Sequence, residues 1–280
     1  MVELNDYKSD VKPAWCPGCS NFGILTALKN ALVISGLKPQ GVVIVSGIGQ
    51  APKLPHYLRG VNVFNGLHGR SLPTATGIKA VSPELKVLTV CGDGDFYGEG
   101  GNHLLHAFRR NPDITCLVHN NQVYALTKGQ ASPTTSLGIK TRLQKDGVKE
   151  EPLNPLELAI TMNCSFVARG YAADLEFLAR IIAEGINHKG LALIDIIQPC
   201  ITFGYHQADW YKDKIVRLTD NHDTTDRDKA LALARQNDEK IFTGVFYKKE
   251  KPTFPEHENN LAGPAIPDGN LLKNLLKDFQ

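Results

Sequence analysis

Two short groups of polar residues have the chemistry to bind a metal ion together with a phosphate group. Gly92-Asp93-Gly94-Asp95 follows the apolar run 86–91, and Asn120-Asn121 follows the apolar run 114–119. Mg²⁺ prefers oxygen ligands and commonly takes one or two from protein side chains, with phosphate oxygens completing the set. We therefore expect Asp93 and Asn121 to bind Mg²⁺, while the glycines let backbone N–H groups approach the phosphate closely.

Strands and helices that alternate along the chain must position these groups. Strands are predicted where short runs are apolar and rich in β-branched residues, at 41–46, 86–91, 114–119 and 191–197. Helices are predicted at 72–81, 98–110, 155–162 and 175–186, and a long loop from 124 to about 154. This order is typical of an α/β fold with a mostly parallel sheet flanked by helices. Ligands bind at the carboxyl ends of such strands, so Asp93 and Asn121 should share one crevice.

Composition narrows the class of protein. The 280 residues are 42% hydrophobic, enough for a sizeable core, and the net charge of +2 suggests neither a nucleic acid nor a membrane surface as a partner. The first ten residues lack the apolar core of a signal peptide, and no apolar run approaches the roughly 20 residues of a membrane helix. We expect a cytoplasmic protein.

The composition changes after Gln198. Charged and polar residues dominate from there, with prolines at 252, 255, 264 and 267. We therefore predict two units, a cofactor-binding domain over 1–200 that includes an N-terminal CxxC segment, and an irregular C-terminal extension over 201–280 that contacts a partner subunit.

Six cysteines are present, and they divide into two kinds. Disulfides are rare in cytosolic proteins, so Cys91, Cys116 and Cys164, which lie in apolar stretches, should be plain buried residues. Cys16-Pro17-Gly18-Cys19 is different, because this spacing suits zinc, a redox disulfide or an iron–sulfur cluster.

The whole pattern resembles a known family. The spacing of Asp93 and Asn121 (121 − 93 = 28) resembles the thiamine diphosphate motif, GDG followed by NN. Further segments resemble the β subunit of 2-oxoacid:ferredoxin oxidoreductases, which include pyruvate and 2-oxoglutarate enzymes. These segments span residues 15–200 and read WCPGC, SGIG, LHGR, GDGDFYGEGGNHLLHAFRRN, NNQVY, TKGQ and QPC. The rest of the chain resembles the family's C-terminal extension more loosely.

The resemblance implies roles for particular residues. Asp93, Asn121 and the backbone carbonyl of Val123 would bind Mg²⁺. Lys53 would approach the bound substrate or cofactor, and with His68 it is a candidate catalytic residue. The residues implied to line the thiamine diphosphate site are Gly47, Ile48, Gly49, His68, Gly92, Asp93, Gly94, Asp95, Asn121, Val123 and Tyr124.

The resemblance also implies a 4Fe–4S cluster, and here the sequence departs from the family. Cys16, Cys19 and Cys200 match three of the family's four ligand positions, but the remaining position, after the Gly47–Gly49 turn, is Gln50. An amide oxygen is a poor ligand for iron in such a cluster. Three interpretations stay open: a cluster with another fourth ligand, a three-iron cluster, or no cluster, with electrons leaving through another subunit.

The implied reaction is the CoA-dependent oxidative decarboxylation of a 2-oxoacid to acyl-CoA and CO₂, with electrons passing to ferredoxin. Thiamine enzymes also need a carboxylate that activates the aminopyrimidine ring, usually from a separate domain that this length does not accommodate. An α subunit is therefore expected.

Two other functions compete with this one. A subunit of a non-oxidative thiamine diphosphate-dependent 2-oxoacid decarboxylase would explain Gln50, because it needs no cluster. A non-catalytic subunit that keeps the fold is disfavoured, because Asp93 and Asn121 are intact.

Overall fold

A mostly parallel sheet forms the centre of the molecule. The computed structural model describes residues 1–206, 208–219, 221–236 and 239–254, and within them eight strands form one sheet in the order β2-β1-β3-β4-β8-β7-β10-β9. Their bounds are β1 Val42–Ser46, β2 Asn62–Asn65, β3 Lys86–Gly92, β4 Ile114–Asn120, β7 Phe166–Tyr171, β8 Ala192–Ile197, β9 Ile215–Arg217 and β10 Ile241–Lys248. The strands β5 Val123–Tyr124 and β6 Gln130–Ala131 form a separate small hairpin.

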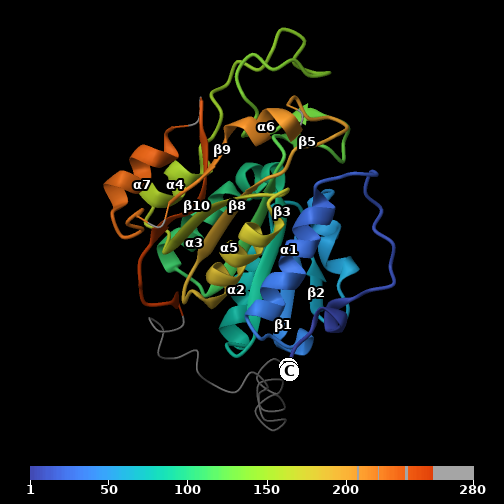
Figure 1. Ribbon diagram of the computed structural model, residues 1–280, viewed down its shortest axis with the longest axis vertical. Helices are drawn as coiled ribbons and strands as arrows, with labels where there is room; N and C mark the ends of the chain where they lie inside the picture. The colour runs from blue at the N-terminus through green and yellow to red at the C-terminus, as the bar shows by residue number, and fades with distance from the viewer. Residues whose placement is uncertain (207, 220, 237–238, 255–280) are drawn as a thin grey trace, which may run out of the picture.

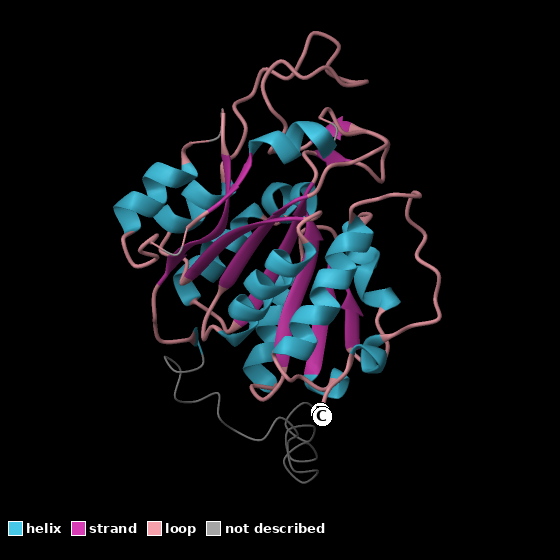
Figure 2. Cartoon of the chain, in the orientation of Figure 1, coloured by secondary structure: helices cyan, strands magenta, loops and turns pink. Residues whose placement is uncertain are grey.

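Helices cover both faces of the sheet (Figure 1). The α-helices are α1 Asn21–Ile34, α2 Ser71–Val81, α3 Gly101–Arg110, α4 Pro155–Thr161, α5 Leu175–Asn187, α6 Ala208–Lys214 and α7 Arg227–Ala234. Short 3₁₀ segments lie at Leu4–Tyr7, Pro39–Gly41 and Ala51–Tyr57, and a π-helix spans Gly94–Glu99. Figure 2 shows the helices on either side of the strands, which confirms the predicted α/β class.

The central strands are mostly apolar because both faces are buried. In β1, Val42 and Ile44 pack into the core with α1 and α5, whereas Val43 and Val45 pack into the core with α2 and α3. All five residues of the strand are buried. Successive side chains of a strand point to opposite faces, so a strand covered on both sides favours apolar residues at successive positions.

The predicted elements are found within one or two residues of their expected positions, but five α-helices and strands before residue 200 were not predicted. Two of them, β5 and β6, form the small hairpin in the predicted loop. The others are α1, the exposed edge strand β2, and β7, which contains Arg169 and Gly170 and so lacks a continuous apolar run. The predicted helix over 98–110 is divided, since the π-helix ends at Glu99 and α3 begins at Gly101. Cys91, Cys116 and Cys164 are free and buried, as expected.

The prediction of an irregular segment after residue 200 is wrong for the part that the structure describes. This part contains α6, β9, α7 and β10. β10 pairs antiparallel with β7, and β9 pairs parallel with β10, so this segment completes the sheet. Its polar composition reflects the exposed side chains of short elements. Residues 255–280 lie outside the described residues, and the predicted partner contact stays a prediction.

No helix in the described ranges is long and apolar enough to cross a membrane.

His119 links β4 to α1. Its side chain is fully buried, and Nδ1 lies 2.7 Å from Asn21 Oδ1, so in the tautomer that this amide oxygen requires Nδ1 is the donor. Nε2 is buried without a hydrogen-bond partner among the described residues. Burial lowers the pKa of His119 to about 3, because the charged imidazolium loses its hydration.

We expect His119 to make the protein less stable in mild acid. The pKa is depressed in the folded state, so the stabilisation is complete above the ordinary value of 6.5 and is lost as the pH falls toward 3. Between pH 7.5 and 5.5 the free energy of unfolding should fall by about 1 kcal/mol through this site. Urea unfolding of the protein and of a His119→Gln variant measures the difference, since glutamine keeps a donor but does not titrate. An equal pH dependence in the two proteins would contradict this assignment.

Candidate functional site

The carboxyl ends of β1, β3 and β4 meet at one edge of the sheet. Ser46 pairs with Val90 and Gly92 pairs with His119, so the residues that follow these strands leave the sheet side by side. Asp93 is the first residue after β3, and Asn120 is the last residue of β4, with Asn121 directly after it. The structure therefore brings the two polar groups of the sequence to one place, as predicted.

Asp93 is a buried carboxylate held by two hydroxyl groups. Its side chain lies just before the π-helix, and only 1% of the residue is exposed. Oδ2 accepts hydrogen bonds from Ser132 Oγ at 2.5 Å and from Thr134 Oγ1 at 2.7 Å. Burial raises the pKa of Asp93 to about 6, although the two hydroxyls act in the opposite direction. A nearby cation would favour the ionised form of this carboxyl group.

Asn121 lies in a tight turn that reverses the chain after β4. Its Oδ1 accepts a hydrogen bond from the backbone N–H of Val123 at 3.0 Å. Gln122, between them, has a φ of 59°, a left-handed conformation that is uncommon for residues other than glycine and is often found at functional sites. Val123 is buried and begins β5. The three predicted metal ligands thus lie at the same sheet edge, and their ligand roles stay predictions.

Asp95 ties two loops to the start of the π-helix. It is 2% exposed, and its Oδ1 accepts hydrogen bonds from the backbone N–H groups of Gly69 at 2.8 Å and Ile48 at 3.2 Å. Its Oδ2 is buried and has no hydrogen-bond partner among the described residues. Burial raises the pKa of Asp95, and the two N–H groups oppose that shift. The side chain therefore has an unused acceptor for a cation or a donor.

Two predicted glycines are required by close approach. A Cβ atom at Gly47 would lie 1.8 Å from Asp95 Oδ2, and one at Gly94 would lie 2.3 Å from the ring of Tyr124. Gly49 has a φ of 138°, which side chains disfavour, whereas Gly92 has open space around it. We call this part of the site the glycine-lined edge. A side chain at Gly47 would collide with the Asp95 carboxylate, and one at Gly94 would collide with the Tyr124 ring.

His68 lies between two carboxylates. Nδ1 is 3.1 Å from Glu99 Oε2 and 3.4 Å from Asp95 Oδ1, although neither contact has hydrogen-bond geometry. The hydroxyl of Tyr124 is 3.2 Å from Glu99 Oε2 and 3.4 Å from the carbonyl oxygen of Gly94. Burial raises the pKa of Tyr124, and the charge of Glu99 adds to that shift. These contacts bring His68, Tyr124 and Asp95 together at this edge of the sheet.

Lys53 is less closely connected to this group. It is half-buried in the 3₁₀ segment Ala51–Tyr57, which follows the Gly47–Gly49 turn directly. Its predicted role at the substrate stays a prediction.

The cysteine segments lie near each other in space. Ser20 Oγ donates to the carbonyl of Pro199 at 2.8 Å, so the CxxC segment lies beside Cys200. Burial raises the pKa of the Cys19 thiol, and the neighbouring Cys200 and Cys16 thiols raise it further. The carbonyl of Gln50 accepts a hydrogen bond from Trp15 Nε1 at 2.9 Å, and Gln50 Oε1 is buried without a partner among the described residues.

The side chains at these two places fit the expected magnesium ion better than the expected iron–sulfur cluster. The described part of the chain contains no group of three or more His, Cys, Asp or Glu side chains arranged to hold a metal ion. The expected magnesium site needs only one such side chain, Asp93, because its other protein ligands are an amide and a carbonyl oxygen. The buried, unpaired Asp95 Oδ2 and the glycine-lined edge fit a cation with a phosphate group. The three thiols lie on neighbouring segments, but in the described residues they are not arranged as a metal-binding group.

Sequence reasoning missed several residues that complete the site. Ser132 and Thr134 lie within the predicted long loop, yet they hold Asp93, and Thr134 Oγ1 also lies 2.9 Å from Asn120 Oδ1. Glu99 lies beside His68 and Tyr124. The Ser-Pro-Thr-Thr sequence at 132–135 is an unusual concentration of hydroxyls, and it was the one available signal.

Two family models match the chain. Residues 46–196 match the thiamine pyrophosphate enzyme, C-terminal TPP binding domain, and residues 200–262 match the C-terminal part of the pyruvate ferredoxin oxidoreductase beta subunit. The first match covers more than half of the chain and contains the glycine-lined edge, Asp93 and Asn121.

Curated relatives and a solved structure agree with these matches. The chain is 44% identical to the 2-oxoacid:ferredoxin oxidoreductase subunit beta of Saccharolobus solfataricus, over 95% of this chain and 89% of the relative. It is 41% identical to the 2-oxoacid:ferredoxin oxidoreductase 1, subunit beta, of Aeropyrum pernix, over 91% and 83%. A solved 2-oxoglutarate:ferredoxin oxidoreductase from Magnetococcus marinus, with 2-oxoglutarate, coenzyme A and succinyl-CoA bound, has a TM-score of 0.90. The two sequences are 34% identical, and the structural match covers 98% of this chain and 96% of the solved chain.

We expect Gly47→Ala to destabilise the protein, because the new methyl group would overlap the Asp95 carboxylate. Overpacking of this kind lowers the free energy of unfolding by about 1–3 kcal/mol. Gly77→Ala is the matched control, since Gly77 lies in α2 with open space around it, and alanine there should be neutral or stabilise by up to about 1 kcal/mol. Thermal and urea unfolding of the purified variants compares them. Equal stability of Gly47→Ala and the unchanged protein would show that the carboxylate moves away freely.

Proposed function

Because this chain belongs to the family of 2-oxoacid:ferredoxin oxidoreductase β subunits, we propose that it binds thiamine diphosphate and Mg²⁺ at the edge formed by β1, β3 and β4. The enzyme would oxidise a 2-oxoacid of the pyruvate or 2-oxoglutarate class to acyl-CoA and CO₂ and reduce ferredoxin. The observation that carries this proposal is the buried Asp93 carboxylate at the end of β3, beside the Asn121 turn at the end of β4.

Mg²⁺ would be held by Asp93, by the side-chain oxygen of Asn121 and by the backbone carbonyl of Val123. Burial supports this assignment, because a carboxylate removed from water gains strongly from a cation. The hydroxyl of Ser132 would hold the orientation of Asp93, as partners of metal ligands commonly do.

The diphosphate would lie against the glycine-lined edge. In this proposal Gly47, Ile48 and Gly49 would lie on one side of the diphosphate, Gly92 and Gly94 beneath it, and Asp95, His68 and Tyr124 around it. Contacts of Ile48 and His68 with Asp95, and of Tyr124 with Gly94, support this grouping. When bound, thiamine diphosphate supplies the carbanion chemistry that allows a 2-oxoacid to lose CO₂. The chain itself binds and orients the cofactor: Asp95 fixes the two loops, and Tyr124 closes over Gly94.

Lys53 and His68 would act on the substrate. Lys53 is a cation in the segment directly after the Gly47–Gly49 turn, where it would attract the carboxylate of a 2-oxoacid. His68 lies close to Asp95 and Glu99, and its ring would donate or accept a proton at the substrate.

An α subunit would complete the active site. The relatives are named as β subunits, and the described residues form one eight-stranded sheet with its covering helices and the small β5-β6 hairpin. The carboxylate that activates the aminopyrimidine ring would therefore come from the α subunit, and ferredoxin and coenzyme A would be the further partners. Relatives named as ferredoxin oxidoreductases favour this function over a non-oxidative decarboxylase.

Cys16, Cys19 and Cys200 would bind an iron–sulfur cluster with a non-cysteine group at the position of Gln50. Contacts between the two segments support this, as Ser20 binds the carbonyl of Pro199 and Thr202 Oγ1 lies 3.4 Å from Cys16 Sγ. Because the thiols are not arranged as a metal-binding group, cluster assembly must reorient these side chains.

We expect Asp93→Ala to abolish Mg²⁺-dependent binding of thiamine diphosphate in the co-purified αβ complex. Loss of the carboxylate removes the only charged ligand proposed for the metal. Calorimetric titration of thiamine diphosphate measures binding, and 2-oxoacid- and CoA-dependent reduction of ferredoxin or a viologen dye measures activity.

Asp228→Ala, at an exposed aspartate of α7, is the control and should leave both measurements unchanged. Unaltered cofactor binding in Asp93→Ala would overturn the metal assignment. Full activity of the β chain alone would show that no α subunit is needed.

The cluster proposal predicts that iron depends on Cys200. In anaerobically purified αβ complex, Cys200→Ser should lose about three or four irons and a similar amount of acid-labile sulfide per β chain, relative to the unchanged protein. Cys164→Ser, at a buried cysteine of the core, is the control and should keep them. The same iron content in both variants would mean that this chain carries no cluster.

A further inference from the structure

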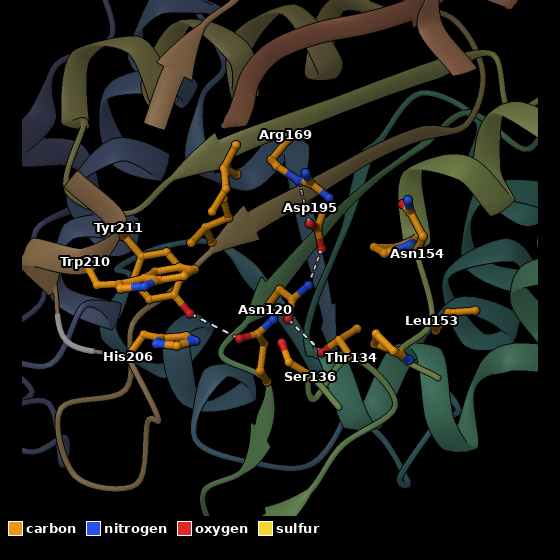
Figure 3. Close-up of a pocket in the computed structure, with 15 residues that line it drawn as sticks. Asn120, Thr134, Ser136, Leu153, Asn154, Arg169, Asp195, His206, Trp210 and Tyr211 are labelled. Atoms are coloured by element: carbon orange, nitrogen blue, oxygen red, sulfur yellow. Dashed lines mark hydrogen bonds and ion pairs between the residues drawn. The ribbon is translucent and has the colours of Figure 1, made fainter. Parts of the chain in front are cut away.

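A row of hydrogen bonds connects Asp93 to a second buried carboxylate, Asp195. Thr134 Oγ1 lies 2.7 Å from Asp93 Oδ2 and 2.9 Å from Asn120 Oδ1. Asn120 Nδ2 in turn donates to Asp195 Oδ1 at 3.0 Å. Figure 3 shows Asp195, Asn120 and Thr134 in this order beside a cavity of about 170 Å³.

Asp195 is firmly held on β8. It is fully buried, and its Oδ1 also accepts a hydrogen bond from Tyr97 at 2.9 Å. Its Oδ2 accepts one from Arg169 Nε, on β7, at 3.3 Å. A buried carboxylate with a cationic partner and two further donors has little freedom to turn.

The chemistry of these groups fixes the direction of each hydrogen bond. An ionised carboxylate only accepts, so Asn120 must turn its amide nitrogen toward Asp195 and its oxygen toward Thr134. The Thr134 hydroxyl has one proton and two acceptors within reach, Asn120 Oδ1 and Asp93 Oδ2. It can therefore donate to either one without leaving its proton unpaired.

We propose that Asp195 is a positioning residue for the metal site. By holding Asn120 Oδ1 toward Thr134, it gives the hydroxyl proton an alternative acceptor. Thr134 then releases Asp93 when a cation binds that carboxylate, at no loss of a hydrogen bond. This inference rests on the proposed binding of Mg²⁺ by Asp93.

Asp195→Asn would reverse the direction of the hydrogen bonds that connect residue 195, Asn120 and Thr134. Arg169 requires an acceptor, so the new amide turns its oxygen to Arg169 and its nitrogen to Asn120. Asn120 must then present its own oxygen to that nitrogen and its amide nitrogen to Thr134. Thr134 loses its alternative acceptor, and its proton stays on Asp93 in competition with the metal.

The test measures retention of thiamine diphosphate by the αβ complex in equilibrium dialysis, with Mg²⁺ titrated at a fixed cofactor concentration. We expect Asp195→Asn to raise the half-saturating Mg²⁺ concentration roughly tenfold, the effect of one hydrogen bond to a charged group. In a Thr134→Val background the same substitution should change it by less than about twofold, because the competing proton is absent.

Tyr97→Phe is the matched control. It removes a hydrogen bond to the same Asp195 oxygen without reversing Asn120, so it should lower stability but not alter the Mg²⁺ requirement. If Asp195→Asn does not fold, Asn120→Leu, which removes the alternative acceptor directly, should give the same shift.

The outcomes separate this inference from the proposed function. If the unchanged complex shows no Mg²⁺-dependent retention of thiamine diphosphate, the proposed function fails. If it does, and Asp195→Asn leaves the Mg²⁺ requirement unchanged or shifts it equally in both backgrounds, the positioning role of Asp195 is overturned.

Discussion

The Asp95 carboxylate joins the chain segments that follow β1, β2 and β3. One of its oxygens accepts hydrogen bonds from the backbone N–H groups of Ile48 and Gly69, which belong to two different loops, while the residue itself lies in the first turn of the π-helix. A buried carboxylate is stable only where donors or cations offset its lost hydration. The loops must therefore approach it closely, and Gly47 allows this because it has no side chain. The shape of the glycine-lined edge follows from this single requirement.

The buried carboxylates at this edge are neutralised to different degrees. Asp195 has the Arg169 guanidinium beside it, whereas Asp93 has two neutral hydroxyls and one oxygen of Asp95 has no hydrogen-bond partner in the described ranges. The charge of Asp195 is thus compensated by the Arg169 guanidinium, whereas no such cation compensates the buried carboxylate of Asp93 among the described residues. Such a difference favours a divalent cation bound between the sheet edge and a phosphate group. The Asp195–Arg169 pair thus supports the site, and the Asp93 carboxylate supplies its negative charge.

The ends of the strands were predicted well from the sequence, because an apolar run followed by polar residues is visible in a few neighbouring positions. Asp93, Asn121 and Asp95 were found in this way. Thr134 and Asp195 could not be found, since their roles depend on contacts across about 40 and 100 residues. β7 was not predicted because Arg169 interrupts its apolar pattern, and the partner of that charge, Asp195, lies on the later strand β8. The cysteine segments were correctly expected to be neighbours, but the orientation of their thiols is a tertiary property that spacing does not determine.

The antiparallel pairing of β10 with β7 has a consequence for biosynthesis. β7 ends at Tyr171, but its partner begins only at Ile241, so during translation β7 remains an edge of the sheet until nearly all of the described chain has been made. An open strand edge exposes unpaired N–H and C=O groups to other chains. Nascent molecules are consequently vulnerable to strand exchange and aggregation late in synthesis, and long-range closure of this kind is slow. Efficient production of the protein would then depend on how quickly the final strand closes that edge.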